Sequence, residues 1–556
     1  MACYVKASER RIYLAVLLAA PLLILLLNRN WPFGGFGDYD AFYYLGFFIH
    51  FPHYQILRNS YPGERLPWIL PGYALVHLFG AVYGNLILHL LCVYAATLSL
   101  NSMVTRFAGA QAGFLAALAL SIHPYFLAAN GMDYVMGGCI AYCLITFALL
   151  VRAGDSGARA RWALLIAAGM SWAAVIYTYP FWALFTPACV SVYWAAKARV
   201  SMRDTISAAM AFAVGCALIT AAMMSVHFLI FHRGGLDFVS NSLGTARFLS
   251  TMRVSPWVTS DRLFFLYADW LVFPGAAALI AILLLTPLGR HWPKMKPGTV
   301  WLLLAYLYFA AVMILATIHP ERRLSFDYYA SFLLPGAFLV FGVTIFDTRM
   351  EFERRWFWVV VTLAALVTLA PLAKPGLYTK PPILGAVLPA MLLTGALAIR
   401  FARPGSVAGT MVMALGFAEA AFCLAPVIGG DAWRTRTDLR ASTGRIAEVV
   451  RNVEGRLPWD RYPAFWYDEG SPNHLEFQAI MCSFLAGGES MLQFPQIPPG
   501  EKYPHGQVLI LLVDRPGVFV EASAAMQARG MPLSFLWEQP MANSGTPYWV
   551  IAAAVQ

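Results

Sequence analysis

Long apolar segments recur through the first 430 positions of the chain, and short polar or charged stretches separate them. Each segment has about the 20 residues that a helix needs to cross a ~30 Å hydrocarbon layer. This pattern predicts a polytopic α-helical membrane protein with about thirteen transmembrane helices. We expect them at residues 12–27, 85–105, 109–128, 135–151, 162–178, 181–196, 205–231, 263–286, 299–318, 329–346, 356–373, 382–399 and 406–428.

Basic residues orient these helices. Lys6, Arg10 and Arg11 precede the first one, and no small-residue cleavage pattern follows it, so it is expected to be a retained anchor with a cytoplasmic amino terminus. The apolar stretch 67–83 is interrupted by Pro71 and Gly72. Interpreting it as a juxtamembrane segment keeps the later basic turns in the cytoplasm, as the positive-inside bias requires.

The loops at the other ends of the helices from these basic turns, together with the tail, then lie on the outer side. Residues 1–429 are predicted to form the transmembrane catalytic domain, and residues 430–556 an extracytoplasmic α/β domain, because strand-like and helix-like patterns alternate there. The expected strands are Pro463 to Tyr467, Val508 to Val513, Leu533 to Trp537 and Tyr548 to Ala553, and the expected helices are Asn473 to Ala486 and Val518 to Arg529.

Composition supports a membrane protein and narrows its chemistry. Hydrophobic residues make up 60% of the chain and charged residues 12%, which is too little polar surface for a soluble globule. The net charge of +10 lies largely in short loops between apolar segments, so nucleic-acid binding is disfavoured. Cys139 and Cys143 share a helix face but have no His or acid partner, and Cys482 is alone in the tail, so neither a thiolate metal site nor a tail disulfide is predicted.

Two acids follow the first predicted helix in Gly37-Asp38-Tyr39-Asp40. Carboxylates are costly near a bilayer and persist where they do chemistry or bind a cation. Asp40 is therefore a candidate catalytic base, and Asp38 a secondary ligand. Either acid also suits the N-cap of the aromatic-rich segment that begins at Ala41 and contains Tyr44, and both roles can coexist.

Other charged residues are predicted on the same side of the membrane. Glu64 and Arg65 enter an apolar segment through proline, either as part of a binding pocket or as a solvated ion pair. Asp133 lies in a short loop, as a second functional carboxylate or a helix cap. Outer loops should be poor in basic residues, so their arginines indicate an anion such as a lipid phosphate, with headgroup or acid contacts as the alternative. These arginines are Arg233, Arg247, Arg253, Arg262, Arg322 and Arg323.

The membrane half resembles the GT-C superfamily of polyprenyl-phosphate-dependent glycosyltransferases, especially the branch with protein O-mannosyltransferases and the lipid A aminoarabinose transferase. That branch has an Asp-x-Asp-Glu motif and a tyrosine after the first helix. Asp38-Tyr39-Asp40-Ala41 and Tyr44 match it, except that Ala41 replaces the glutamate.

Three later segments extend the resemblance. Glu64-Arg65-Leu66-Pro67 is similar to the Glu-Lys-Pro-Pro element of the branch, and Asp133 occupies the position of its acid before the fourth span. Tyr328 and Pro335 match its late Arg-Tyr-x-x-x-Pro segment only loosely.

The resemblance implies an inverting glycosyltransferase that moves a sugar from a polyprenyl phosphate to an acceptor hydroxyl at the outer face. Asp40 would be the base and Asp133 would orient the acceptor, while Glu64 and Arg65 shape the donor pocket and the outer arginines hold the phosphate. The partners would be the lipid-linked donor, an acceptor glycan, lipid or protein, and membrane lipids. No cofactor is assigned; a divalent cation is left open, with Asp40 and Asp133 as its ligands.

Two other classes of function remain open at this stage. A transporter or lipid flippase also has many helices and intramembrane acids, but it usually carries charged residues near the midplane. A scaffold of an envelope assembly would use the tail as its binding module. In that tail, Trp459, Trp466, Tyr467, Asp468 and Glu469 are candidates for a carbohydrate-binding rim or for ordinary packing. We expect the bacterial inner membrane as the location of the protein.

Overall fold

The described part of the chain forms two compact units. The computed structural model describes residues 7–27, 40–52, 61–131, 135–197, 201–232, 238–241, 243–244, 296–318, 331–347, 463–468, 471, 475–486, 491–494, 503–543 and 546–556. The first unit takes in Met1–Phe36, Arg65–Trp68 and His89–Gly429, and the second Gly37–Glu64, Ile69–Leu88 and Gly430–Gln556. The predicted domain boundary at residues 429 and 430 lies outside the described residues and stays a prediction.

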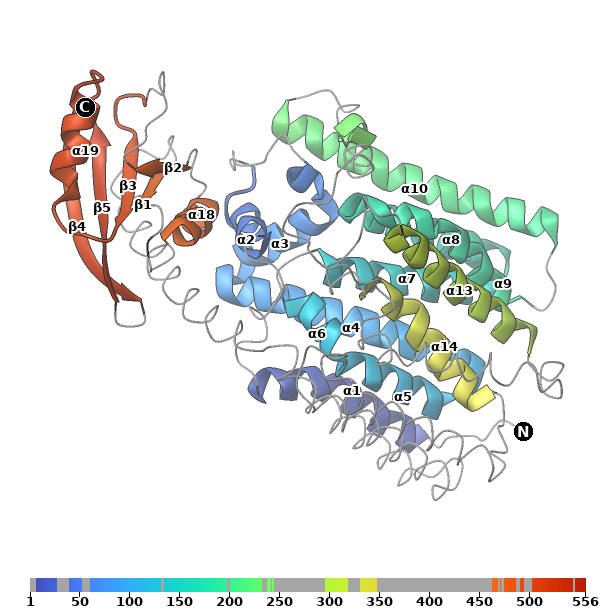
Figure 1. The fold of residues 1–556 in the computed structure, drawn as a ribbon. Coiled ribbons are helices and arrows are strands. Elements are labelled where there is room, and N and C mark those ends of the chain that lie inside the picture. Colours follow the sequence, from blue (N-terminus) through green and yellow to red (C-terminus); the bar gives the residue numbers. More distant parts are fainter. Residues whose placement is uncertain are drawn as a thin grey trace. The chain divides into compact units, whose positions relative to one another are not determined.

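Helices build the first unit (Figure 1). They are α1 (Ala7–Leu27), α4 (Ala81–Ala108, from His89 onward), α5 (Ala110–Ser121), α6 (Pro124–Gly131), α7 (Met136–Asp155), α8 (Ala158–Thr178), the 3₁₀ helix η3 (Pro180–Phe185), α9 (Thr186–Ala195), α10 (Met202–Phe231), α13 (Pro297–Ile318) and α14 (Leu334–Asp347). Among the described residues, α4, α7, α8 and α10 are long and apolar enough to cross a membrane. The chain is an integral membrane protein.

Two predicted spans are broken in the structure. The segment 109–128 was expected to be one helix, but α5 ends at Ser121 and α6 begins at Pro124. The segment 181–196 divides into η3 and α9, with Pro187 in the first turn of α9. Proline lacks the N–H that an uninterrupted helix requires, so each new helix starts at or just before one. The spans expected at 263–286, 356–373, 382–399 and 406–428 lie outside the described residues, so the count of about thirteen is not confirmed.

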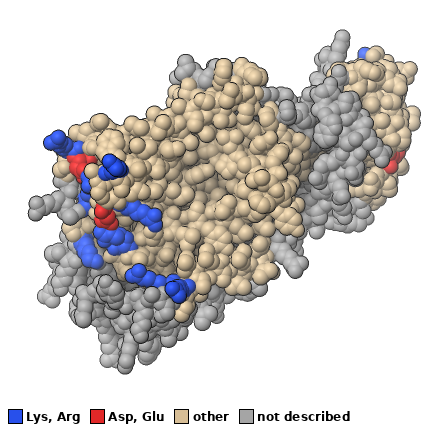
Figure 2. Space-filling model, turned by 180° about the vertical axis from the view of Figure 1, so that it is seen from behind, with Lys and Arg blue, Asp and Glu red and all other residues tan. Residues whose placement is uncertain are grey.

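Charged side chains gather at one end of the helical unit (Figure 2). Arg106 near the end of α4 pairs with Asp155 at the end of α7, with Nη2 2.7 Å from Oδ1. Asp204 in the first turn of α10 accepts from Arg161 of α8 at 2.9 Å and from Lys197 after α9 at 2.8 Å. The end of α7 and the start of α8 therefore lie together, so the start of α7 and the end of α8 lie at the opposite end.

Helices α8 and α10 approach each other through glycine. A Cβ at Gly169 would collide with the Phe212 carbonyl oxygen, and one at Gly215 with the Ile166 carbonyl oxygen. The Cys216 thiol donates to the Gly169 carbonyl at 3.3 Å. Small residues allow such close backbone packing between membrane helices, where contact rather than exclusion of water holds the helices together.

The second unit contains a five-stranded sheet in the order β2-β1-β3-β5-β4. The strands are β1 (Ala464–Asp468), β2 (Met491–Phe494), β3 (Val508–Val513), β4 (Leu533–Asn543) and β5 (Thr546–Val555), and the helices α18 (Leu475–Ala486) and α19 (Val518–Gln527) follow β1 and β3. Strand β1 pairs in parallel with β2 and β3, whereas β5 is antiparallel to β3 and β4. The α/β prediction is confirmed here, with β2 as an addition.

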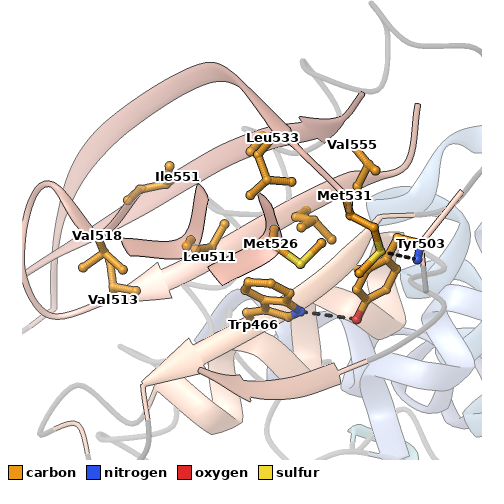
Figure 3. Packing of buried hydrophobic residues seen from close by; sticks show 14 residues of the cluster. Trp466, Tyr503, Leu511, Val513, Val518, Met526, Met531, Leu533, Ile551 and Val555 are labelled. Atoms are coloured by element: carbon orange, nitrogen blue, oxygen red, sulfur yellow. Dashed lines mark hydrogen bonds between the residues drawn. The ribbon is translucent and has the colours of Figure 1, made fainter. Parts of the chain in front are cut away.

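Apolar residues cover both faces of this sheet. Figure 3 shows one face, where Trp466 and Leu511 pack with Val518 and Met526 of α19. The Trp466 Nε1–H donates to the Tyr503 hydroxyl at 3.4 Å. Trp466 is therefore a buried core residue, and its proposed place in a carbohydrate-binding rim is wrong. The alternation of side chains along β1 puts Phe465 on the other face, with Leu475 of α18.

The second unit also contains the helix that starts at Asp40. This helix, α2 (Asp40–His50), packs against α18, and the His50 Nε2–H donates to the Leu485 carbonyl at 2.7 Å. The Phe48 ring occupies the space that a Cβ at Gly72 of α3 (Leu66–Phe79) would need. The tail thus helps to hold the helix that carries the candidate base.

A half-buried carboxylate lies at the end of β1. Asp468 Oδ2 accepts the backbone N–H of Asp514, which follows β3, at 3.1 Å. Burial raises the pKa of Asp468 above its ordinary value of 3.8, while the Asp514 N–H opposes the shift and the Asp514 carboxylate adds to it. Ionisation of Asp468 therefore costs folding free energy.

Gly169→Ala is expected to lower the melting temperature of the detergent-solubilised protein, because overpacking typically costs about 1–3 kcal/mol. Gly157→Ala is the matched control, since nothing lies within 4 Å of a Cβ added there. Equal melting temperatures for both variants and the wild type would contradict the close approach of α8 and α10.

Asp468→Asn keeps an acceptor for the Asp514 N–H and removes the charge. The stabilisation that comes from protonated Asp468 is lost as the pH rises through the raised pKa, so the variant should resist denaturant better than the wild type at pH 7. The two proteins should converge below the ordinary aspartate pKa of 3.8. Unfolding of the tail is followed in the full chain by peroxide oxidation of the Met526 thioether, which is buried in the folded state. A thioether does not titrate, so the probe itself is independent of pH. A difference that grows toward low pH would refute the assignment.

Candidate functional site

The segment Arg65–Trp68 belongs to the first unit and lies at its end opposite the charged one. Trp68 packs against Gly138 near the start of α7, and the Tyr142 hydroxyl of α7 donates to the Pro67 carbonyl at 2.8 Å. Arg65 lies over Tyr179, the residue after α8. Because α8 has 21 residues, these contacts are about 30 Å along the helix from its charged start.

Arg65 is a buried cation. Only 2% of its surface is exposed, and its Cζ atom lies 5.4 Å from the centre of the Tyr179 ring. The electron-rich ring face attracts the guanidinium, and the attraction is stronger away from water. A guanidinium carries its five N–H donors in its own plane, and this planar fork is the group through which arginine recognises phosphate. This arrangement suits a phosphate.

Aromatic rings surround the end of α8. Tyr179 packs against Phe332, which precedes α14, with ring centres 5.5 Å apart. Phe332 also contacts Trp182 of η3, and Trp182 contacts Phe309 of α13. The Arg65 guanidinium thus lies over one member of a buried aromatic cluster. Sequence reasoning missed Tyr179, although Tyr179-Pro180-Phe181-Trp182 places aromatic residues at a proline break.

One interpretation of the sequence made Glu64 and Arg65 a solvated ion pair. The structure contradicts it. Glu64 ends the 3₁₀ helix η2 (Tyr61–Glu64), and like Arg65 it is 2% exposed. Burying a charged group is costly, so such groups are usually kept where they bind something or are paired. Their place in a donor pocket stays a prediction.

Two more candidates are described in the second unit. Asp40 is the first residue of α2, so its backbone has the helix-start position that the sequence predicted. Tyr44, one turn later, is fully buried, and its ring centre lies 6.4 Å from that of Phe47.

The other candidate residues lie outside the described part of the chain. They are Asp38, Asp133, Arg233, Arg247, Arg253, Arg262, Arg322, Arg323 and Tyr328. Within the described part, no group of three or more His, Cys, Asp and Glu side chains could hold a metal ion. Their roles, and a cation at Asp40 and Asp133, stay predictions.

No protein-family model matches the chain, and no curated protein sequence does. Its structure is similar to ArnT from Cupriavidus metallidurans bound to undecaprenyl phosphate, with a TM-score of 0.57, 15% identity and 97% of each chain covered. The apo state of that ArnT gives a TM-score of 0.52 and 14% identity, over 96% of this chain and 97% of that one. The chain has the GT-C fold.

Tyr179→Leu is expected to destabilise the GT-C bundle, since it removes the ring under Arg65 and leaves a cavity worth about 2–4 kcal/mol. Tyr179→Phe keeps the ring face and should stay close to the wild type. Melting curves in detergent compare the three proteins. If the Phe variant loses as much stability as the Leu variant, the hydroxyl and not the ring face holds this site together.

Proposed function

We propose that this chain is an inverting glycosyltransferase that moves a sugar from a polyprenyl phosphate to an acceptor hydroxyl at the outer face of the membrane. The observation that carries the proposal is Arg65, a buried guanidinium that lies over Tyr179 at one end of a GT-C bundle. The similar ArnT structure holds undecaprenyl phosphate, a lipid-linked phosphate of the kind that such a cation would bind.

The proposed reaction is a single displacement. Asp40 accepts the proton of the acceptor hydroxyl while the acceptor oxygen forms a bond to the anomeric carbon. The bond from that carbon to the phosphate oxygen breaks, and its electron pair leaves with the polyprenyl phosphate. Attack from the side opposite the phosphate inverts the anomeric configuration. Asp133 orients the acceptor.

Cationic groups stabilise the leaving phosphate, whose negative charge grows as the bond breaks. Arg65 is the described member of this set. The arginines expected to complete it are Arg233, Arg247, Arg253, Arg262, Arg322 and Arg323. Asp38, Tyr44, Glu64 and Tyr328 line the donor and acceptor pockets in this proposal.

The partners are a polyprenyl-phosphate sugar and a hydroxyl of an envelope glycan, lipid or protein. The location is a bacterial inner membrane, with the amino terminus in the cytoplasm and the tail outside. The cluster of Arg106, Arg161 and Lys197 at one end of the bundle supports this orientation, because basic residues favour the cytoplasmic side.

A transporter or flippase is less favoured. Transporters often carry ionisable residues near the middle of the membrane. The four described helices that could span a membrane contain two acids, Asp155 and Asp204, and both form ion pairs at the charged end of the bundle.

Asp40→Asn should lower the rate of sugar transfer by about 10²–10⁴, because the amide cannot accept the acceptor proton. The assay follows labelled sugar from a synthetic polyprenyl-phosphate donor into the acceptor fraction. Asp155→Asn, at the far end of α7, is the control and should transfer at nearly the wild-type rate. A folded Asp40→Asn enzyme with wild-type transfer would rule Asp40 out as the base.

A further inference from the structure

Two residues on one face of α7 hold the segment that begins with Arg65. Gly138 and Tyr142 are four residues apart, so they share a helix face. A Cβ at residue 138 would lie 2.7 Å from the Trp68 Cε3 atom, so glycine lets the indole pack on the helix backbone. The Tyr142 hydroxyl donates to the Pro67 carbonyl at 2.8 Å. Pro67 and Trp68, which follow Arg65 closely in the chain, thus both contact α7.

The Pro67 carbonyl lacks its usual helical donor because of a second proline. In an α-helix the carbonyl of one residue accepts the N–H of the residue four positions later. For Pro67 in α3 that residue is Pro71, which has no N–H. A backbone carbonyl left without a partner in an apolar region is costly. The Tyr142 hydroxyl supplies the donor that the sequence of α3 removes.

Tyr142 also ties α7 to the helix that leads to Tyr179. The Ser171 hydroxyl of α8 donates to the Tyr142 carbonyl at 2.9 Å. Helix α8 ends at Thr178, and the next residue supplies the ring beneath Arg65. Tyr142 therefore contacts both the segment that begins with Arg65 and helix α8, which leads to Tyr179.

We propose that Tyr142 is a positioning residue for Arg65, and that Gly138 contributes by leaving room for Trp68 against α7. The inference rests on the proposed function, in which Arg65 binds the phosphate of a polyprenyl-phosphate donor. Tyr142 and Gly138 fix the start of α3 against α7, so that the guanidinium lies over Tyr179 and the N–H bonds in its plane face the phosphate. An arginine released from this support would keep its charge and lose its orientation.

Binding of undecaprenyl phosphate to the purified full chain tests the proposal, with undecaprenol as the neutral probe. Tyr142→Phe should weaken phosphate binding about two- to tenfold, the effect of losing one hydrogen bond. In an Arg65→Lys background the same substitution should change binding little, because lysine lacks the planar guanidinium that needs orienting. Gly138→Ala should weaken binding in the same way through Trp68.

Tyr94→Phe is the matched control and should bind like the wild type, because its hydroxyl donates to the Leu18 carbonyl at 2.7 Å, between α4 and α1. If Tyr142→Phe binds as the wild type does, or loses affinity equally in both backgrounds, the positioning role is wrong and the proposed function stands. If the wild type binds undecaprenyl phosphate no more tightly than undecaprenol, the proposed function is wrong, and the role of Tyr142 is wrong with it.

Discussion

The burial of the Arg65 charge is the constraint on which the rest of this structure depends. A cation that leaves water loses several kcal/mol of hydration even after the protein relaxes around it. The Tyr179 ring offsets part of that loss, and the aromatic cluster around Phe332 holds the ring. The ends of α8 and η3 are thus arranged around one guanidinium. The buried charge therefore constrains how the end of α8, η3 and the segment that begins with Arg65 pack together.

The chain passes from one compact unit to the other at the peptide bond between Glu64 and Arg65. On one side of that bond, the helix that begins at Asp40 packs with α18 of the tail. On the other side, Arg65 is held by α7 and by the residue after α8. The tail therefore supports α2, the helix that begins at Asp40.

The hydrophobic pattern predicted most of the described helices and most of the sheet, since length and periodicity are local properties of a sequence. It failed at Pro124 and Pro187, where an apolar run continues across a break in the helix, and it did not reveal the four-residue strand β2. The charge of Glu64 and Arg65 marked them as candidates, but only packing shows that they are buried. Tyr142 and Tyr179 were not predicted, because each acts through a contact with a residue distant in the sequence.

Release of sugar from a synthetic polyprenyl-phosphate donor by the purified wild-type chain tests the central claim most directly. The chain is reconstituted in lipid nanodiscs with the labelled donor and envelope acceptors, and the products are separated and their anomeric configuration is determined. The account predicts a product glycoside of inverted configuration, together with free polyprenyl phosphate in equal amount. Intact donor after prolonged incubation with the folded protein, or a product of retained configuration, would contradict it.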